Sequence, residues 1–86
     1  MKYEIIFSPR ASKELRALHR LPIGRRLSDA IDALADNPRP RGCIKTTAQQ
    51  TWRIRVGDYR VVYDIDDVVR IVAIDRVEAR GSVYER

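Results

Sequence analysis

The chain has 86 residues, of which 44% are hydrophobic and 34% are charged, a composition that excludes a disordered chain and allows one small domain with a thin core. Its 17 Lys and Arg residues outnumber its 12 Asp and Glu residues, which gives a formal net charge of +5, and only Lys2, Lys13 and Lys45 are lysines. Because a guanidinium group binds phosphate through two parallel hydrogen bonds, this arginine excess favours a polyanionic partner, although a small basic domain can also carry such charge for solubility alone.

The N-terminal part of the chain predicts a strand followed by a helix. Residues 2–8 alternate between polar and apolar side chains, broken only by Ile6, which is typical of a strand. We expect the strand to end at Ser8-Pro9, because serine is a preferred helix N-cap and proline fits the first helical position. A short amphipathic helix that runs to about His19 is then indicated by apolar residues at helical spacing, Ala11, Leu15 and Leu18.

A second helix has the strongest pattern in the chain. Leu21-Pro22 separates it from the first helix. Its apolar residues follow one helical face: Ile23, Leu27, Ala30, Ile31 and Leu34. Asn37-Pro38, followed by Pro40 and Gly42, should end this helix, because the residue before a proline is pushed out of the helical region.

From Thr51 the apolar residues recur at every second position, which predicts a hairpin with Gly57-Asp58 as its two-residue turn. A glycine in the first turn position suits a type II′ turn. We expect a further tight turn at Asp66-Asp67 and another strand from Val68 to Asp75. The whole chain, residues 1–86, is thus predicted to be one α+β domain with an N-terminal strand, a two-helix hairpin and then antiparallel strands in one twisted sheet (β-α-α-β-β-β).

The turn fixes which residues face each other across the hairpin. Arg55 should lie opposite Arg60, on the same face as Arg53, while the apolar residues of both strands share the other face with the helices. Tyr59, Tyr63 and Trp52 are then core residues. Two like charges directly opposite each other destabilise a sheet by up to roughly 1 kcal/mol, so the arginine pair suggests an anion-binding site. The alternative is that both arginines extend into solvent or bind Asp58 and Asp64.

The same hairpin resembles the central hairpin of the RelE/ParE toxin superfamily, with the sequence Trp52-Arg53-Ile54-Arg55-Val56-Gly57-Asp58-Tyr59-Arg60-Val61-Val62-Tyr63. The similarity continues in Ser8-Pro9-Arg10-Ala11 and in the C-terminal Arg80-Gly81-Ser82-Val83-Tyr84. It implies a RelE-like toxin of a type II toxin–antitoxin system, with a cognate acidic antitoxin as partner and with operator DNA bound only through that antitoxin.

The resemblance leaves three functions open. RelE-like members enter the ribosomal A site and cut messenger RNA, which makes the ribosome with its message the expected partner. ParE-like members instead inhibit DNA gyrase, and an inactive homologue would only bind its antitoxin.

For a nuclease, the resemblance assigns catalytic roles to Arg60, Arg80 and Tyr84 and phosphate-binding roles to Arg53 and Arg55, and we expect Lys45 to bind phosphate as well. The 2′-hydroxyl of RNA would attack the adjacent phosphorus and leave a 2′,3′-cyclic phosphate, so the reaction needs no metal. Lysines stand at the positions of Arg53 and Arg55 in the best-known nuclease member. A guanidinium group cannot readily lose a proton, so an acid or base role of those lysines does not transfer.

Other residues give little sign of chemistry. Cys43 is the only cysteine, so no internal disulfide can form, and the chain has no zinc-site spacing. His19 is the only histidine, and we expect it on the surface. No segment is long and apolar enough for a signal peptide or a membrane span. We therefore expect a cytoplasmic protein with no metal, no other cofactor and no membrane partner.

Overall fold

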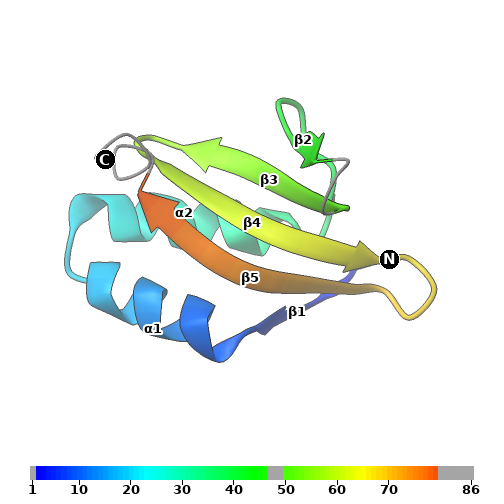
Figure 1. Cartoon of the computed structure of the whole chain (residues 1–86), viewed down its shortest axis with the longest axis horizontal. Helices are drawn as coiled ribbons and strands as arrows, with labels where there is room; N and C mark the ends of the chain where they lie inside the picture. The colour runs from blue at the N-terminus through cyan, green and yellow to red at the C-terminus, as the bar shows by residue number, and fades with distance from the viewer. Residues whose placement is uncertain (1, 47–49, 80–86) are drawn as a thin grey trace.

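The computed structural model describes residues 2–46 and 50–79. The first half of the chain folds as β1 (Glu4–Phe7), α1 (Pro9–Leu18) and α2 (Pro22–Ala33). The second half forms β2 (Ile44–Thr46), β3 (Thr51–Val56), β4 (Tyr59–Asp66) and β5 (Ile71–Ala79). The strands make one sheet in the order β1-β5-β4-β3-β2, so the predicted α+β architecture is confirmed (Figure 1).

Two features of the sheet were not predicted. The first strand pairs with β5 in parallel, so the sheet is mixed, with antiparallel pairing only from β5 to β2. In addition, β2 pairs with β3 as a fifth strand. With three residues, β2 is too short for an alternating pattern to be visible in the sequence.

The start of α1 confirms the predicted cap. The Ser8 hydroxyl accepts a hydrogen bond from the Ala11 N–H at 3.0 Å, and Pro9 occupies the first helical position. The Ser8 hydroxyl also donates to the Asp75 carbonyl oxygen at 2.5 Å. The cap therefore sets the start of the helix and fastens it to β5 at the same time.

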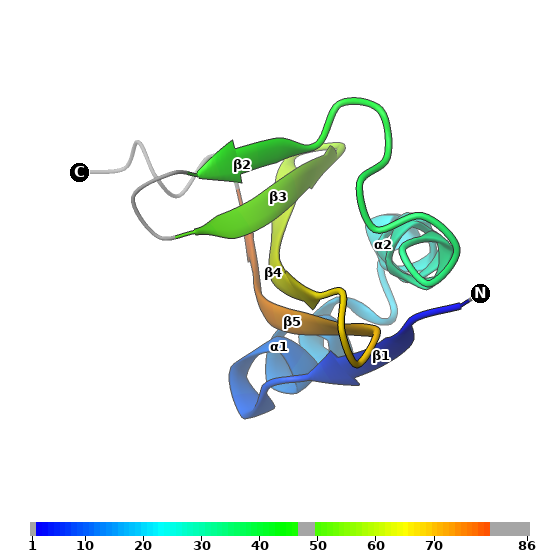
Figure 2. The same ribbon diagram turned by 90° about the vertical axis from the view of Figure 1, so that its right-hand side faces the viewer.

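The core lies between the helices and one face of the sheet. Figure 2 shows α2 on one side of the curved sheet. The largest side chains that are fully buried there are Tyr63, Leu27, Ile31, Leu34, Ile74, Val61 and Val72. Tyr63 also donates a hydrogen bond from its hydroxyl to the Pro38 carbonyl oxygen at 2.7 Å, and its burial raises the pKa of the phenol above the ordinary value. This bond holds the segment that follows α2 against the sheet.

The last strand was predicted at the wrong position. The prediction placed it at Val68–Asp75, whereas β5 runs from Ile71 to Ala79. The Asp66 carboxylate accepts hydrogen bonds from the N–H groups of Val68 and Val69, at 3.0 and 3.2 Å, and these bonds lengthen the turn. The two valines are 91% and 59% exposed, so they belong to the turn and not to the strand.

A bulge explains why β5 continues past Asp75. Val62 pairs with Arg76, but the next residue, Tyr63, pairs with Ile74, which leaves Asp75 as the extra residue. The alternation of buried and exposed residues therefore changes phase at Asp75. Within the described residues, neither helix is long and apolar enough to cross a membrane.

Candidate functional site

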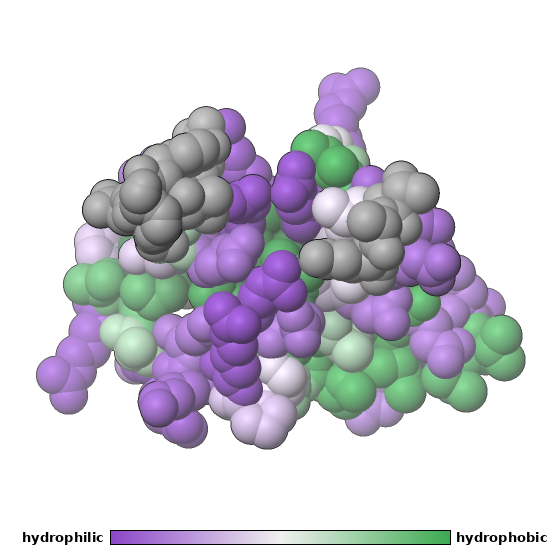
Figure 3. Space-filling model, viewed as in Figure 1, coloured by the Kyte–Doolittle hydropathy of each residue, from purple (hydrophilic) through white to green (hydrophobic). Residues whose placement is uncertain are grey.

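Four arginines extend from the face of the sheet that α2 does not cover. Buried Ile54, Val56 and Val61 point from β3 and β4 toward the helices, so the residues between them point the opposite way. The four residues are Arg53 and Arg55 of β3, Arg60 of β4 and Arg76 of β5. We call them the arginine face. Figure 3 shows hydrophilic residues over this side of the sheet, which in Figure 1 lies in front of α2.

The predicted register of the hairpin is confirmed. Arg55 pairs with Arg60 across β3 and β4, and Gly57 in the turn has a φ of 60°, as the first position of a type II′ turn requires. Arg55 is exposed and donates to the Gly57 carbonyl oxygen at 3.3 Å. The alternative that both arginines bind Asp58 and Asp64 is not found among the described contacts.

The acidic neighbour of Arg60 is Glu78, which was not among the predicted site residues. The two residues pair across β4 and β5, and the Arg60 Nε lies 3.9 Å from a Glu78 carboxylate oxygen. The Arg60 side chain is only 19% exposed.

The Nε–H of Arg60 is a buried donor that finds no acceptor in the described part of the chain. This nitrogen has no hydrogen-bond partner among residues 2–46 and 50–79, because 3.9 Å to Glu78 is too long for a hydrogen bond. A buried donor that stays unpaired costs roughly 1–3 kcal/mol. A phosphate oxygen that displaced the surrounding groups and reached this nitrogen would supply the missing acceptor and offset that cost.

Arg76 shares the same carboxylate. Its Nε donates to Glu78 at 3.2 Å and its NH1 donates to Asp75 at 2.6 Å. Although burial opposes the charge, these two bonds raise the pKa of Arg76 above its ordinary value. Glu78 therefore stands between two arginines and limits how strongly they repel each other. One feature of the sequence indicates that Arg76 and Glu78 belong to the strand. The alternation of apolar and polar residues changes phase at Asp75, which is typical of a bulge rather than of a strand end.

Lys45 is not part of the arginine face. It pairs with Trp52 across β2 and β3, and its ammonium nitrogen lies 5.6 Å from the centre of the indole ring. Arg39 lies over the same ring at 5.1 Å. Trp52 also packs against the core, so it is a packing residue in contact with two cations, on the helix side of the sheet.

The Arg39 cation is further fixed by an acidic partner. It donates two hydrogen bonds to Asp67, at 2.7 and 3.3 Å, and the Tyr3 hydroxyl donates to the same carboxylate at 2.6 Å. These bonds from Arg39 and Tyr3 lower the pKa of Asp67. This network joins the N-terminal segment to the β4–β5 turn, and its role is structural.

Arg80 and Tyr84 lie outside the described residues. The described part of β5 ends at Ala79, which pairs with Tyr59 beside the Gly57-Asp58 turn. The segment that carries these two residues therefore starts from the end of the sheet where Arg55 and Arg60 are paired.

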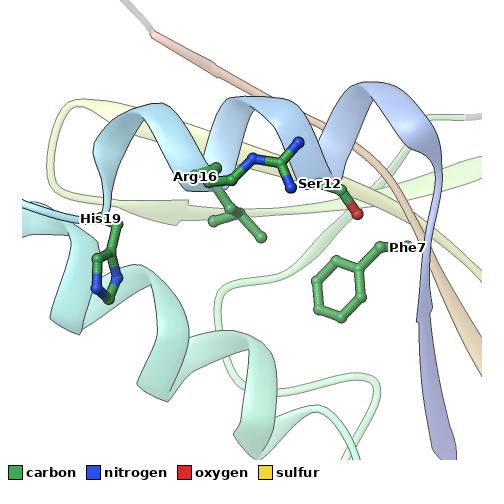
Figure 4. A pocket seen from close by; sticks show the side chains of 5 residues that line it. Phe7, Ser12, Arg16 and His19 are labelled. Atoms are coloured by element: carbon green, nitrogen blue, oxygen red, sulfur yellow. The ribbon is translucent and has the colours of Figure 1, made fainter.

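Two concavities border these elements. One, of about 470 Å³, opens on the side of the arginine face and is lined by residues of β1, β3, β4 and β5. The other, of about 450 Å³, lies beside α1 and is lined by Phe7, Ser12, Leu15, Arg16 and His19 (Figure 4). His19 is exposed, as predicted. Among the described residues, no three His, Cys, Asp or Glu side chains gather as metal ligands would.

Comparison with known proteins gives one family. Residues 5–81 match the family described as ParE toxin of type II toxin–antitoxin system, parDE. None of the curated proteins matches the chain.

Several solved structures share the fold. A chain of the archaeal RelE–RelB complex from Pyrococcus horikoshii OT3 is 28% identical, with a TM-score of 0.78 over 94% of this chain and 98% of that one. A chain of the toxin–antitoxin complex RelBE2 from Mycobacterium tuberculosis is 30% identical, with a TM-score of 0.69 over 93% and 100%. A mutant of the E. coli toxin RelE in the free state is 25% identical, with a TM-score of 0.72 over 95% and 87%.

Proposed function

The chain belongs to the ParE toxin family of type II toxin–antitoxin systems, within the RelE/ParE superfamily, and we propose that it is a ribosome-dependent endoribonuclease that cuts messenger RNA. The observation that carries the proposal is the arginine face, together with the buried Nε–H of Arg60, for which the described residues offer no hydrogen-bond acceptor. Similarity to proteins named RelE over nearly the whole chain supports the same reading.

The reaction needs a site that stabilises negative charge on phosphorus. The 2′-oxygen attacks the adjacent phosphorus, the bond to the 5′-oxygen breaks, and the phosphate oxygens gain charge in the transition state. We assign Arg60 to that phosphate, because its Nε–H lacks a hydrogen-bond acceptor within the described part of the chain. Arg53 and Arg55, the latter exposed to solvent, bind the flanking phosphates and set the position of the strand.

The C-terminal residues complete the proposed site. Arg80 provides a second cation for the scissile phosphate, and Tyr84 stacks on a base or accepts a proton. Free RNA is not held in line for attack, so the ribosome has to position the message. We expect weak activity on free RNA and strong activity during translation.

The name of the matched family favours a second candidate, inhibition of DNA gyrase. Two assays with the same protein sample separate the two functions. A translating extract should show cut messenger RNA, while a gyrase supercoiling assay should show normal supercoiling. Intact message together with inhibited supercoiling would reverse the assignment, and no effect in either assay would indicate a homologue that only binds its antitoxin.

We also propose that an acidic antitoxin covers the concavity beside α1. Solved relatives are toxin–antitoxin complexes, and this chain has a net charge of +5. The concavity combines apolar Leu15 and a 43% exposed Phe7 with the cation of Arg16, which suits an apolar segment with acidic residues.

Co-expression tests this partner. A short acidic protein encoded next to this chain should suppress growth arrest, and Arg16→Glu should weaken that suppression. Arg25→Glu on α2, where the side chain is 86% exposed, is the matched control and should leave suppression unchanged. Equal suppression of all three chains would place the antitoxin elsewhere.

A further inference from the structure

The concavity next to the arginine face is lined by residues that lie side by side on β1, β5, β4 and β3. Ile6 of β1 pairs with Ala73 of β5, and Ala73 pairs in turn with Asp64 of β4. The register of β3 places Thr51 beside Asp64, so one row of four residues crosses the sheet. Val72 and Ile74 are buried on the helix side, so Ala73 between them faces the opposite way. Its small side chain leaves the space of about 470 Å³.

The chemistry of the lining selects against an anion. Ile6, which is 43% exposed, and Ala73 supply apolar surface, while Asp64 and Asp75 supply two carboxylates. A phosphate group would be repelled there, so this hollow does not extend the phosphate-binding surface. A flat apolar group with N–H donors on its edge would instead find both the surface and the acceptors that it needs.

Each carboxylate keeps one oxygen available. Asp64 accepts a hydrogen bond from the Ile65 N–H through Oδ1 at 2.9 Å, and Asp75 accepts from Arg76 through Oδ2 at 2.6 Å. Within the described residues, their other oxygens accept no hydrogen bond. The bond to Arg76 also holds Asp75 at the border between the hollow and the arginine face.

The spacing suits one nucleotide. Val62 and Arg76 form the row next to Asp64 and Ala73 on the same face of the sheet, and neighbouring rows on one face are about 7 Å apart. A comparable span separates the phosphate from the base within a nucleotide. A strand bound at the arginines can therefore turn a base into the hollow.

We propose that this hollow binds an RNA base that carries an exocyclic amino group, next to a phosphate held by the arginine face. The proposal rests on the proposed function for the identity of the polymer. Adenine, cytosine and guanine each present an amino group to the carboxylates, whereas uracil presents carbonyl oxygens beside its single N–H. Uracil should therefore bind least well.

Binding of four RNA trinucleotides, U-N-U with N as each of the four bases, tests the proposal without a ribosome. In NMR titrations the amides of Ala73 and Thr51 should shift, and UAU, UCU and UGU should bind about fivefold more tightly than UUU, the ratio that one net hydrogen bond gives. Asp64→Asn should reduce this preference, and Ala73→Leu, which fills the hollow, should abolish it while weak binding of all four remains.

Asp29→Asn on α2, whose side chain is 69% exposed, removes the same charge elsewhere and should change nothing. Equal affinity for all four trinucleotides would overturn the proposal, as would a preference that survives both hollow variants. A base preference without cleavage in a translating extract would contradict the proposed nuclease activity but support base binding in the hollow. Cleavage with no base preference would support the nuclease activity but contradict base binding in the hollow.

Discussion

Replacement of Arg60 by alanine is expected to lower cleavage of translated messenger RNA by about 100-fold, because removal of one fixed donor to a developing oxyanion costs a factor of roughly 10² to 10³. Arg60 is the arginine whose Nε–H is buried and has no hydrogen-bond acceptor among residues 2–46 and 50–79, so we assign it to the phosphate that gains charge. Toxicity on induction should fall in parallel with cleavage.

Two further variants make this result specific. Arg60→Lys keeps the charge but lacks both the planar fork and the Nε–H, so it should restore little of the activity. Arg25→Ala removes a cation that is 86% exposed on α2 and should act like the unmodified chain. Thermal unfolding of each variant checks that the fold is intact. Cleavage by Arg60→Ala at the rate of the unmodified chain would show that Arg60 takes no part in the reaction.

Glu14→Ala should lower the free energy of unfolding by about 2 kcal/mol, the typical contribution of a hydrogen bond to a charged group. The Glu14 carboxylate of α1 accepts a hydrogen bond from the Val77 N–H of β5 at 2.7 Å. Pairing between β1 and β5 ends at Ile74, so this N–H has no strand beside it. Glu14 supplies the acceptor that the missing strand would have given.

This loss should be measured as a fall in Tm of roughly 10 °C, since each kcal/mol shifts the Tm of a domain of this size by about 4–8 °C. Glu14→Gln keeps an oxygen that can accept from Val77 and should lose much less. Activity should fall as well, because Val77 lies between Arg76 and Glu78 on the bulged strand. Equal Tm values for Glu14→Ala and the unmodified chain would show that the bond contributes nothing.

Local signals predicted most of the fold correctly. The Ser8 cap and the Gly57 turn depend on a few neighbouring residues, so their geometry could be derived from the sequence. The parallel pairing of β1 with β5 joins segments that are far apart in the chain, and no local pattern encodes such a choice of partner.

The candidate site was predicted only in part, for the same reason. The pairing of Arg55 with Arg60 follows from a two-residue turn and a period of two. Arg76 and Glu78 were missed because the bulge at Asp75 shifts the alternation of side chains in β5. A prediction that assumes an unbroken period of two therefore ends the strand at Asp75. Lys45 was expected to bind phosphate with Arg53 and Arg55, but its pairing with Trp52 places it on the helix side of the sheet.

Mapping of RNA ends in a translating extract tests the proposed nuclease most directly. With the unmodified chain, new ends should lie within codons at the ribosomal A site, should carry 2′,3′-cyclic phosphates, and should be absent from the same message without ribosomes. Arg60→Ala should leave the message intact. An uncut message in an extract that stops translating, or cuts that do not depend on ribosomes, would contradict the assignment.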